Sequence, residues 1–183
     1  IMGIAVWDKL PDTMAIHFNI NNVADSFAPK SLVLLGLPVM MMFFQIFCCV
    51  ANDINAHNHG RSIKFEMVSK WIVPIMTIVL QTTIIGYGLS WNPDVRKIAT
   101  FLAGVIFISL GICIPKLDYV KNMELDTQRA RKINKFTGIS MVIMGVLSLV
   151  SMFLPPIFAV VWVILIILYS VVCIVYAMVV ARK

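Results

Sequence analysis

Five long apolar blocks constrain this chain more than any other feature, because none of them contains Asp, Glu, Lys, Arg or His. They cover residues 31–51, 71–89, 98–114, 136–154 and 157–181, in a chain of 183 residues that is 60% hydrophobic and 13% charged. Each block has the length of a membrane-spanning helix, about 17–25 residues. Lipid admits only helices and closed barrels, and these continuous runs lack the alternation of barrel strands. The sequence therefore predicts an all-α, polytopic membrane protein.

A shorter apolar run, "IMGIAVW", occupies residues 1–7. It is too short to cross a bilayer, which takes about 20 residues. We expect it to be the tail of a first transmembrane helix that is truncated at its start, which gives six spans in total. The alternative is the remnant of a cleaved signal peptide, but the run lacks a small-residue cleavage pattern before Asp8.

The basic residues are distributed unequally between the two sets of loops. The loops after the second and fourth spans, together with the tail, hold eleven of the 15 Lys and Arg residues, and residues 8–30, the loop after span three and the loop after span five hold the other four. Cytoplasmic loops carry an excess of Lys and Arg. The bias predicts that both termini are cytoplasmic and that residues 8–30 lie outside.

The polar side chains inside the predicted spans are uncharged. The principal candidates for a functional role among them are Gln45, Gln81 and Thr82. Such groups commonly form hydrogen bonds between helices. Pro38 and Pro74 predict kinks or local opening of the backbone in the same two spans. Interhelical bonding is one interpretation, and a small cavity that holds a lipid or peptide substrate is the other.

The segment "ANDINAHNHGR", residues 51–61, contains Asp53, His57 and His59. Histidines two residues apart share a face only in an extended chain, and zinc sites usually have three or four ligands in tighter patterns. We expect a solvated cytoplasmic turn, with a weak metal site as the alternative. The chain has no phosphate-binding loop, nucleophile elbow or zinc-protease motif, so we expect neither an enzyme nor a cofactor.

The polar stretch before the first long block has its own pattern. In "MAIHFNI", Ala15, His17 and Asn19 alternate with Met14, Ile16, Phe18 and Ile20. A period of two is typical of a strand. We therefore expect an ordered cap on the bundle, whose apolar face packs and whose polar face either meets a ligand or bonds back into the cap.

The same stretch resembles the extracytoplasmic signature that recurs at the N-terminus of the SdpI-like family of bacterial membrane immunity proteins. The matching positions in "LPDTMAIHFNINNVADSFAPK" are Leu10, Pro11, Ile16, His17, Phe18, Asn19, Asp25 and Lys30. Ala15 stands where that pattern usually has proline, and Asn22 where it usually has glycine. Asn tolerates the left-handed backbone that glycine would supply, so we expect the turn to persist.

The second half of the chain resembles an SdpI domain in order and topology. "GICIPKL", from Gly111, and "RKINKFTG", which ends at Gly138, take the places of two family motifs, and "KNMELDTQ" replaces the box between them. The resemblance divides the chain into three parts. Residues 1–51 hold the end of the first span, the cap and the second span. Residues 52–97 hold a cytoplasmic loop, the third span and an outer loop, and residues 98–183 hold the SdpI-like spans.

The resemblance implies a multi-pass protein of the bacterial cytoplasmic membrane that protects its host from a secreted antimicrobial peptide toxin. It makes the cap residues candidates for toxin binding: His17, Phe18, Asn19, Asp25 and Lys30. It also implies a cytoplasmic partner such as a transcriptional repressor, for which the basic residues Arg129, Arg131, Lys132 and Lys135 are candidates. The same residues fit anionic lipid or a plain positive-inside bias, and nothing in the chain suggests direct binding of nucleic acid.

Two other functions compete with immunity at this stage. The chain would be an accessory subunit or carrier in a membrane transport complex if Gln45 and Gln81 lined a cavity. It would be a membrane enzyme if His17 and Asp25, or the group of Asp53, His57 and His59, formed a site.

Overall fold

The computed structural model of the chain describes residues 2–59, 62–116 and 127–182. Five helices in this part are long and apolar enough to cross a membrane. They are α2 (Leu37–His59, preceded by the π-helical turn η2, Leu32–Gly36), α3 (Ile63–Gly88), α4 (Val95–Cys113), α5 (Thr127–Ser151) and α6 (Ile157–Arg182). The five long apolar blocks are thus confirmed as helices, consistent with a multi-pass membrane protein.

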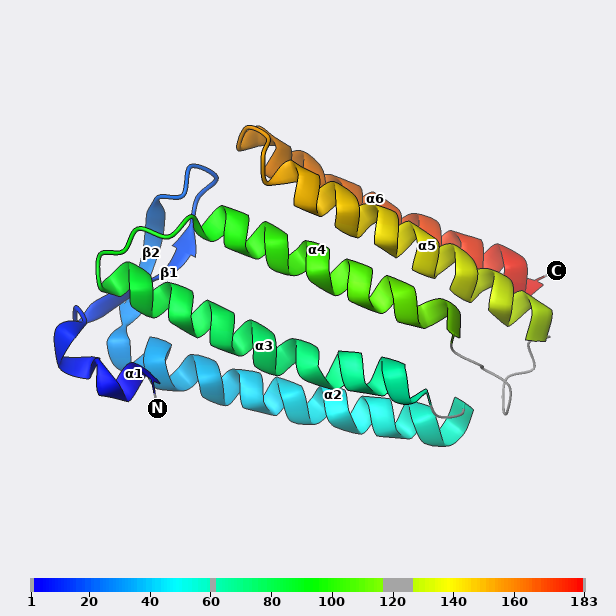
Figure 1. Cartoon of the computed structure of the whole chain (residues 1–183), viewed down its shortest axis with the longest axis horizontal. Helices are drawn as coiled ribbons and strands as arrows, with labels where there is room; N and C mark the ends of the chain where they lie inside the picture. The colour runs from blue at the N-terminus through cyan, green and yellow to red at the C-terminus, as the bar shows by residue number, and fades with distance from the viewer. Residues whose placement is uncertain (1, 60–61, 117–126, 183) are drawn as a thin grey trace.

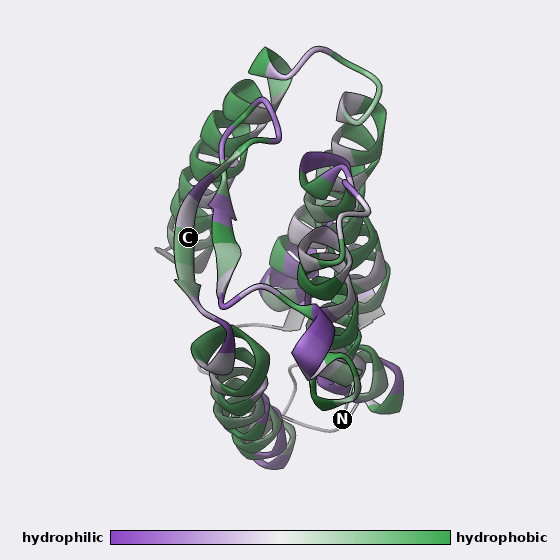
Figure 2. Ribbon diagram, turned by 90° about the vertical axis from the view of Figure 1, so that its left-hand side faces the viewer, coloured by the Kyte–Doolittle hydropathy of each residue, from purple (hydrophilic) through white to green (hydrophobic). Residues whose placement is uncertain are grey.

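The long helices run up and down, and each contacts the next one along the chain (Figure 1). The β-strands, the α3–α4 connection and the α5–α6 turn lie at one end of the bundle, and the C-terminus lies at the other. Figure 2 shows that the helices are mostly hydrophobic, with hydrophilic residues among the strands and connections. Within the described residues, the two sets of basic residues that sequence analysis distinguished lie at opposite ends of the bundle.

The short helix α1 (Met2–Ala5) and the 3-10 turns η1 (Trp7–Lys9) and η3 (Ile114–Lys116) complete the helical elements. Helix α1 has only 4 residues, and Gly3 lies directly against Leu34. A side chain at Gly3 would meet Leu34 Cδ2 at 3.0 Å, so the missing side chain allows the N-terminal segment to approach the start of the first long helix.

Two strands form an antiparallel hairpin, β1 (Thr13–Phe18) and β2 (Ala24–Pro29). The first strand confirms the predicted ordered segment, whereas the second was expected only as turn residues and a lead into the next span. The predicted alternation is wrong. Met14 and Ala15 are both buried, whereas Ile16 is 54% exposed. The physical reason is a bulge at Ile16, an extra residue that interrupts the regular alternation of the strand.

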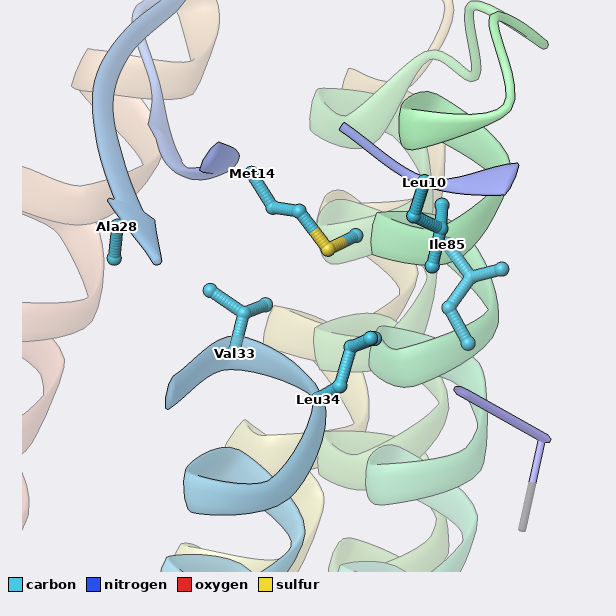
Figure 3. Packing of buried hydrophobic residues seen from close by; sticks show 6 residues of the cluster. All are labelled: Leu10, Met14, Ala28, Val33, Leu34 and Ile85. Atoms are coloured by element: carbon cyan, nitrogen blue, oxygen red, sulfur yellow. The ribbon is translucent and has the colours of Figure 1, made fainter. Parts of the chain in front are cut away.

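The hairpin packs on the bundle through a small apolar cluster. Figure 3 shows Met14 of β1 among Leu10, Ala28, Val33, Leu34 and Ile85. Met14 is 2% exposed, and burying a side chain of this size contributes about 1.5–3 kcal/mol. This cluster fixes the hairpin across the ends of α2 and α3.

Two helical extensions differ from the sequence prediction. Helix α2 continues through residues 51–59, which we expected to form a solvated turn, and α3 begins at Ile63 rather than at residue 71. Neighbouring helices support each other here, because Ser69 Oγ donates to Asn52 Oδ1 at 3.1 Å and Lys70 Nζ donates to Asp53 Oδ1 at 2.6 Å. Polar residues that favour turns locally are thus held in helices by contacts between them.

Candidate functional site

The turn of the hairpin is built by two asparagines. Asn19 Oδ1 accepts hydrogen bonds from the backbone N–H groups of Asn21 at 3.0 Å and Val23 at 3.1 Å. Asn22 has a left-handed backbone with φ 61°, as its place in the family pattern predicts. Its side chain donates to Pro93 O at 3.0 Å and accepts from Val95 N at 2.8 Å. The turn is therefore fastened to the start of α4.

His17 and Asp25 form the exposed polar pair of the hairpin. His17 Nδ1 lies 2.5 Å from Asp25 Oδ1, and the two side chains are 67% and 42% exposed. Ile16 and Asp25 are the extra residues of two irregularities in the strand register, one on each strand. Bulges commonly re-aim side chains, and here they bring the imidazole and the carboxylate together on the outer surface.

The remaining cap candidates hold the hairpin in place. The Phe18 ring contacts Tyr87 of α3 edge-on, with centroids 4.8 Å apart. Lys30 Nζ lies 3.1 Å from Asp12 Oδ1 and 5.4 Å from the centroid of the Trp7 ring. Phe18, Asn19 and Lys30 thus have structural contacts, whereas His17 and Asp25 are available to a ligand.

A groove of about 470 Å³ opens beside this pair, between the hairpin, the first turns of α4 and the first half of α6. Ile16, His17 and Ile20 line its hairpin side. The other walls come from α4 and α6, and they include Arg96, Thr100, Trp162 and Ile166. This volume lies within the range of about 300–1,000 Å³ that is typical of ligand sites. The groove is mostly apolar, and its polar side chains come from the hairpin and the first turns of α4, which contribute His17, Asn19, Arg96 and Thr100.

The charges at the polar end of the groove are Arg96, Lys97, Asp94 and the His17–Asp25 pair. Asp94 caps α4 by accepting from Lys97 N at 3.0 Å, and its carboxylate lies 3.3 Å from Lys97 Nζ. Arg96 donates through Nη1 to Leu154 O at 3.2 Å, and its Nη2 lies 4.0 Å from Asp94 Oδ2. Lys97 thus lies close enough to offset Asp94, and Arg96 is the basic side chain that lines the groove itself.

The mid-span glutamines bridge α2 and α3 in a reciprocal way. Gln45 Nε2 donates to Lys70 O at 2.9 Å, and Gln81 Nε2 donates to Leu34 O at 3.5 Å. In the α-helix α3 the carbonyl of Lys70 would accept from the residue four positions later, which is Pro74 and has no N–H. Gln45 thus supplies a donor that Pro74 removes, whereas Leu34 lies in the π-helical turn η2, where i to i+4 pairing does not apply.

This arrangement gives the predicted intramembrane candidates a bonding role. Thr82 Oγ1 donates to Ile78 O of its own helix at 2.7 Å. Thr82 also lines a smaller groove of about 310 Å³ beside Trp91 and Pro93, and a third groove of about 340 Å³ lies between α3 and α4. Gln45 and Gln81 line none of these three grooves.

The candidate metal residues Asp53 and His57 both lie on α2. Asp53 pairs with Lys70, whereas the side chain of His59 lies outside the described part of the chain. Within residues 2–59, 62–116 and 127–182, no group of three His, Cys, Asp or Glu side chains is close enough to hold a metal ion. This test does not extend to residues 60–61, 117–126 and 183.

The basic candidates Arg129, Arg131, Lys132 and Lys135 lie in the first turns of α5, at the opposite end of the bundle from the hairpin. Lys132 and Lys135 are exposed. The preceding residues 117–126, which contain Lys121 and most of the "KNMELDTQ" segment, lie outside the described residues. The two flanking motifs do meet, because Gly138 lies directly against Pro115 and Gly111.

Sequence reasoning missed Arg96 and Trp162 as groove residues. Arg96 was counted only as a loop charge, and Trp162 lies inside an apolar block. One signal was available, since Asn22 departs from glycine in the family pattern and its side chain ties the hairpin to the start of α4, where Arg96 lies.

Comparison with known sequences gives one match. Residues 1–42 match the family described as "Domain of unknown function (DUF1648)". The matched region contains α1, the hairpin and the beginning of the first long helix. No curated protein and no solved structure matches the chain. The hairpin therefore lies within the part of this molecule that matches a described sequence family.

Proposed function

We propose that this chain is an integral immunity or resistance protein of the SdpI-like type, which protects a producing bacterium against a secreted antimicrobial peptide. The single observation that supports this function is the groove beside the exposed His17–Asp25 pair. An amphipathic peptide needs an apolar surface next to polar partners at the membrane boundary. The groove offers Ile16 and Ile20 together with His17.

The proposed orientation places the hairpin end outside the bacterial cytoplasmic membrane and both termini in the cytoplasm. The unequal distribution of Lys and Arg between the two ends supports this orientation. A peptide that arrives from outside would then meet the hairpin first. The exposed Lys132 and Lys135, on the cytoplasmic side, would meet a soluble partner or anionic lipid.

A carrier or accessory transport subunit is the competing function, and the structure offers it less support. That function required a cavity beside the mid-span glutamines. Gln45 and Gln81 instead donate to backbone carbonyls of the neighbouring helix.

Two matched hairpin variants test the proposal. Ile16 and Val23 are both aliphatic and similarly exposed, at 54% and 56%, but only Ile16 lines the groove. In sensitive cells that express the chain and are exposed to sporulation-delaying peptide, Ile16→Glu should reduce protection at least tenfold, and Val23→Glu should leave it unchanged. His17→Ala should also reduce protection.

Immunoblotting of membranes is the expression control, because the comparison requires that all variants are present at equal levels. Full protection by both Ile16→Glu and His17→Ala would remove the hairpin groove from the mechanism. Protection lost equally in Val23→Glu would instead indicate that any charge on the hairpin is harmful.

A further inference from the structure

We infer that the groove between the hairpin, α4 and α6 binds one anionic glycerophospholipid, with its headgroup near Arg96 and an acyl chain between α4 and α6. This inference goes beyond the proposed function, which concerns a secreted peptide. It rests on the polarity of the groove, its position on lipid-facing helices and two donor groups along its walls.

The polar lining of the groove is gathered at one end. His17, Asn19 and Arg96 lie there, among the apolar side chains of the hairpin, whereas Ala103, Val163 and Ile166 line the part that extends along the helices. The stretch of α4 from Val95 to Ala103 spans about 12 Å at 1.5 Å per residue. A ligand that matches this surface has a polar head and an apolar chain of comparable length.

A lipid of the bilayer can reach the groove from the side of the bundle, next to helix α6. In the most apolar 18-residue stretch of α6, no residue is buried inside the protein. This part of the helix therefore faces the hydrocarbon region when the bundle spans a membrane. Val163 and Ile166 belong to this helix and also line the groove. An acyl chain of the bilayer can therefore enter between α4 and α6 without crossing the polar end.

Arg96 favours an anionic headgroup. Its side chain is only 18% exposed, and its partners within the described part of the chain are Leu154 O and, at 4.0 Å, Asp94. A guanidinium group has five N–H donors, so donors remain for phosphate oxygens. Lys97 offsets the nearby Asp94 carboxylate, which would otherwise repel a phosphate.

Trp162 supplies the second donor. It is 7% exposed, it lines the groove, and its indole N–H has no hydrogen-bond partner within the residues that the structure describes. A buried donor without an acceptor costs about 1–3 kcal/mol. The nitrogen is covered by protein atoms, so a small rotation of the indole ring must precede donation to an ester carbonyl of the lipid.

The test is native mass spectrometry of the full chain, released by mild detergent from vesicles of equal parts phosphatidylglycerol and phosphatidylcholine. The unmodified chain should retain one phosphatidylglycerol, at least fivefold in excess over phosphatidylcholine. Arg96→Gln should abolish this preference, and Ala99→Phe, which fills the groove, should reduce total retention at least fivefold.

Matched controls lie outside the groove. Lys9→Gln removes an exposed positive charge from the turn η1, and Val105→Phe adds an aromatic ring on another face of α4, so both should behave like the unmodified chain. Thermal unfolding in detergent checks that each variant is folded.

Three results would overturn the inference: no retained lipid, equal retention of the two lipids by the unmodified chain, or retention unaffected by both groove variants. Binding of a peptide to a groove that retains no lipid would overturn the lipid site and leave the proposed function standing. If Ile16→Glu abolished protection in cells but left lipid retention unchanged, protection against the peptide and binding of the lipid would be shown to be separate properties.

Discussion

The helix pairs α2–α3 and α4–α5 are held together by opposite means. Helices α4 and α5 form the most extensive helix contact in the bundle, and glycines face each other across it. The first long helix and α3 instead exchange hydrogen bonds, from Gln45 to Lys70 O, which Pro74 leaves without its usual donor, and from Gln81 to Leu34 O. Lipid offers no hydrophobic drive for helix association, so close packing and polar bonds take its place.

The glycine contact leaves no room for a single carbon atom. A Cβ at Gly104 would lie 3.0 Å from Gly145 O, and one at Gly111 would lie 2.7 Å from Gly138 O. Ser148, with 0% exposure, continues the contact by donating to Thr100 O at 2.9 Å. The α4–α5 pair thus depends on glycines, which have no side chain, whereas the α2–α3 pair depends on the polar side chains of two glutamines. This difference predicts how each pair responds to substitution.

The largest effect is expected at Gly138. Its Cβ would collide with Pro115 and lie 2.6 Å from Gly111 O, so Gly138→Ala should lower the free energy of unfolding by about 3 kcal/mol. Thermal unfolding in detergent measures the change. Gly36→Ala is the matched control, because its Cβ would meet only the end of Leu32 at 3.1 Å. Equal loss of stability in both variants would mean that the close approach of α4 and α5 is not what holds them.

The second effect concerns Gln45 and Pro74. Gln45→Leu should destabilise the protein by about 1–2 kcal/mol, because Lys70 O loses its donor. Pro74→Ala restores a backbone N–H four residues after Lys70, so the double variant should recover most of that loss. A double-mutant cycle measured by unfolding gives the coupling energy. Strictly additive losses would show that the glutamine does not compensate for the proline.

The smallest effect is expected at Gln81. Both glutamines have a buried Oε1 without a partner in the described part of the chain, so they differ in the bond that each donates, and the bond from Gln81 to Leu34 O is long, at 3.5 Å. Gln81→Leu removes only this weak bond, so stability should change by less than about 0.5 kcal/mol. The same cycle with Pro38→Ala should show little coupling. A loss larger than that of Gln45→Leu would reverse the ranking of the two bridges.

The sequence predicted the long helices well because each is encoded by a local property, a run of apolar residues without charge. It predicted the first strand and the left-handed Asn22 for similar local reasons. It did not predict which side of the strand is buried, since the bulge at Ile16 depends on pairing with residues about ten positions away. It did not reveal the glycine contact either, because Gly104 and Gly145 acquire meaning only when α4 and α5 lie side by side.

The candidate site was also predicted in part from local sequence, and the rest of it depends on tertiary contacts. The family pattern drew attention to Phe18, Asn19 and Lys30 together with His17 and Asp25, but it could not separate the residues that build the hairpin from those exposed to a ligand. Contacts with Tyr87, Asp12 and the turn backbone make that separation. Arg96 and Trp162 joined the site only because α4 and α6 fold beside the hairpin.

By itself, then, the sequence determined that the chain forms long apolar helices joined to an ordered polar cap, because hydropathy and turn chemistry act over neighbouring residues. Tertiary structure decided the rest. It placed a donor from Gln45 opposite the carbonyl that Pro74 leaves without one, glycines opposite glycines, and Arg96 in the same groove as His17. Those pairings join residues far apart in the chain, so no local pattern specifies them.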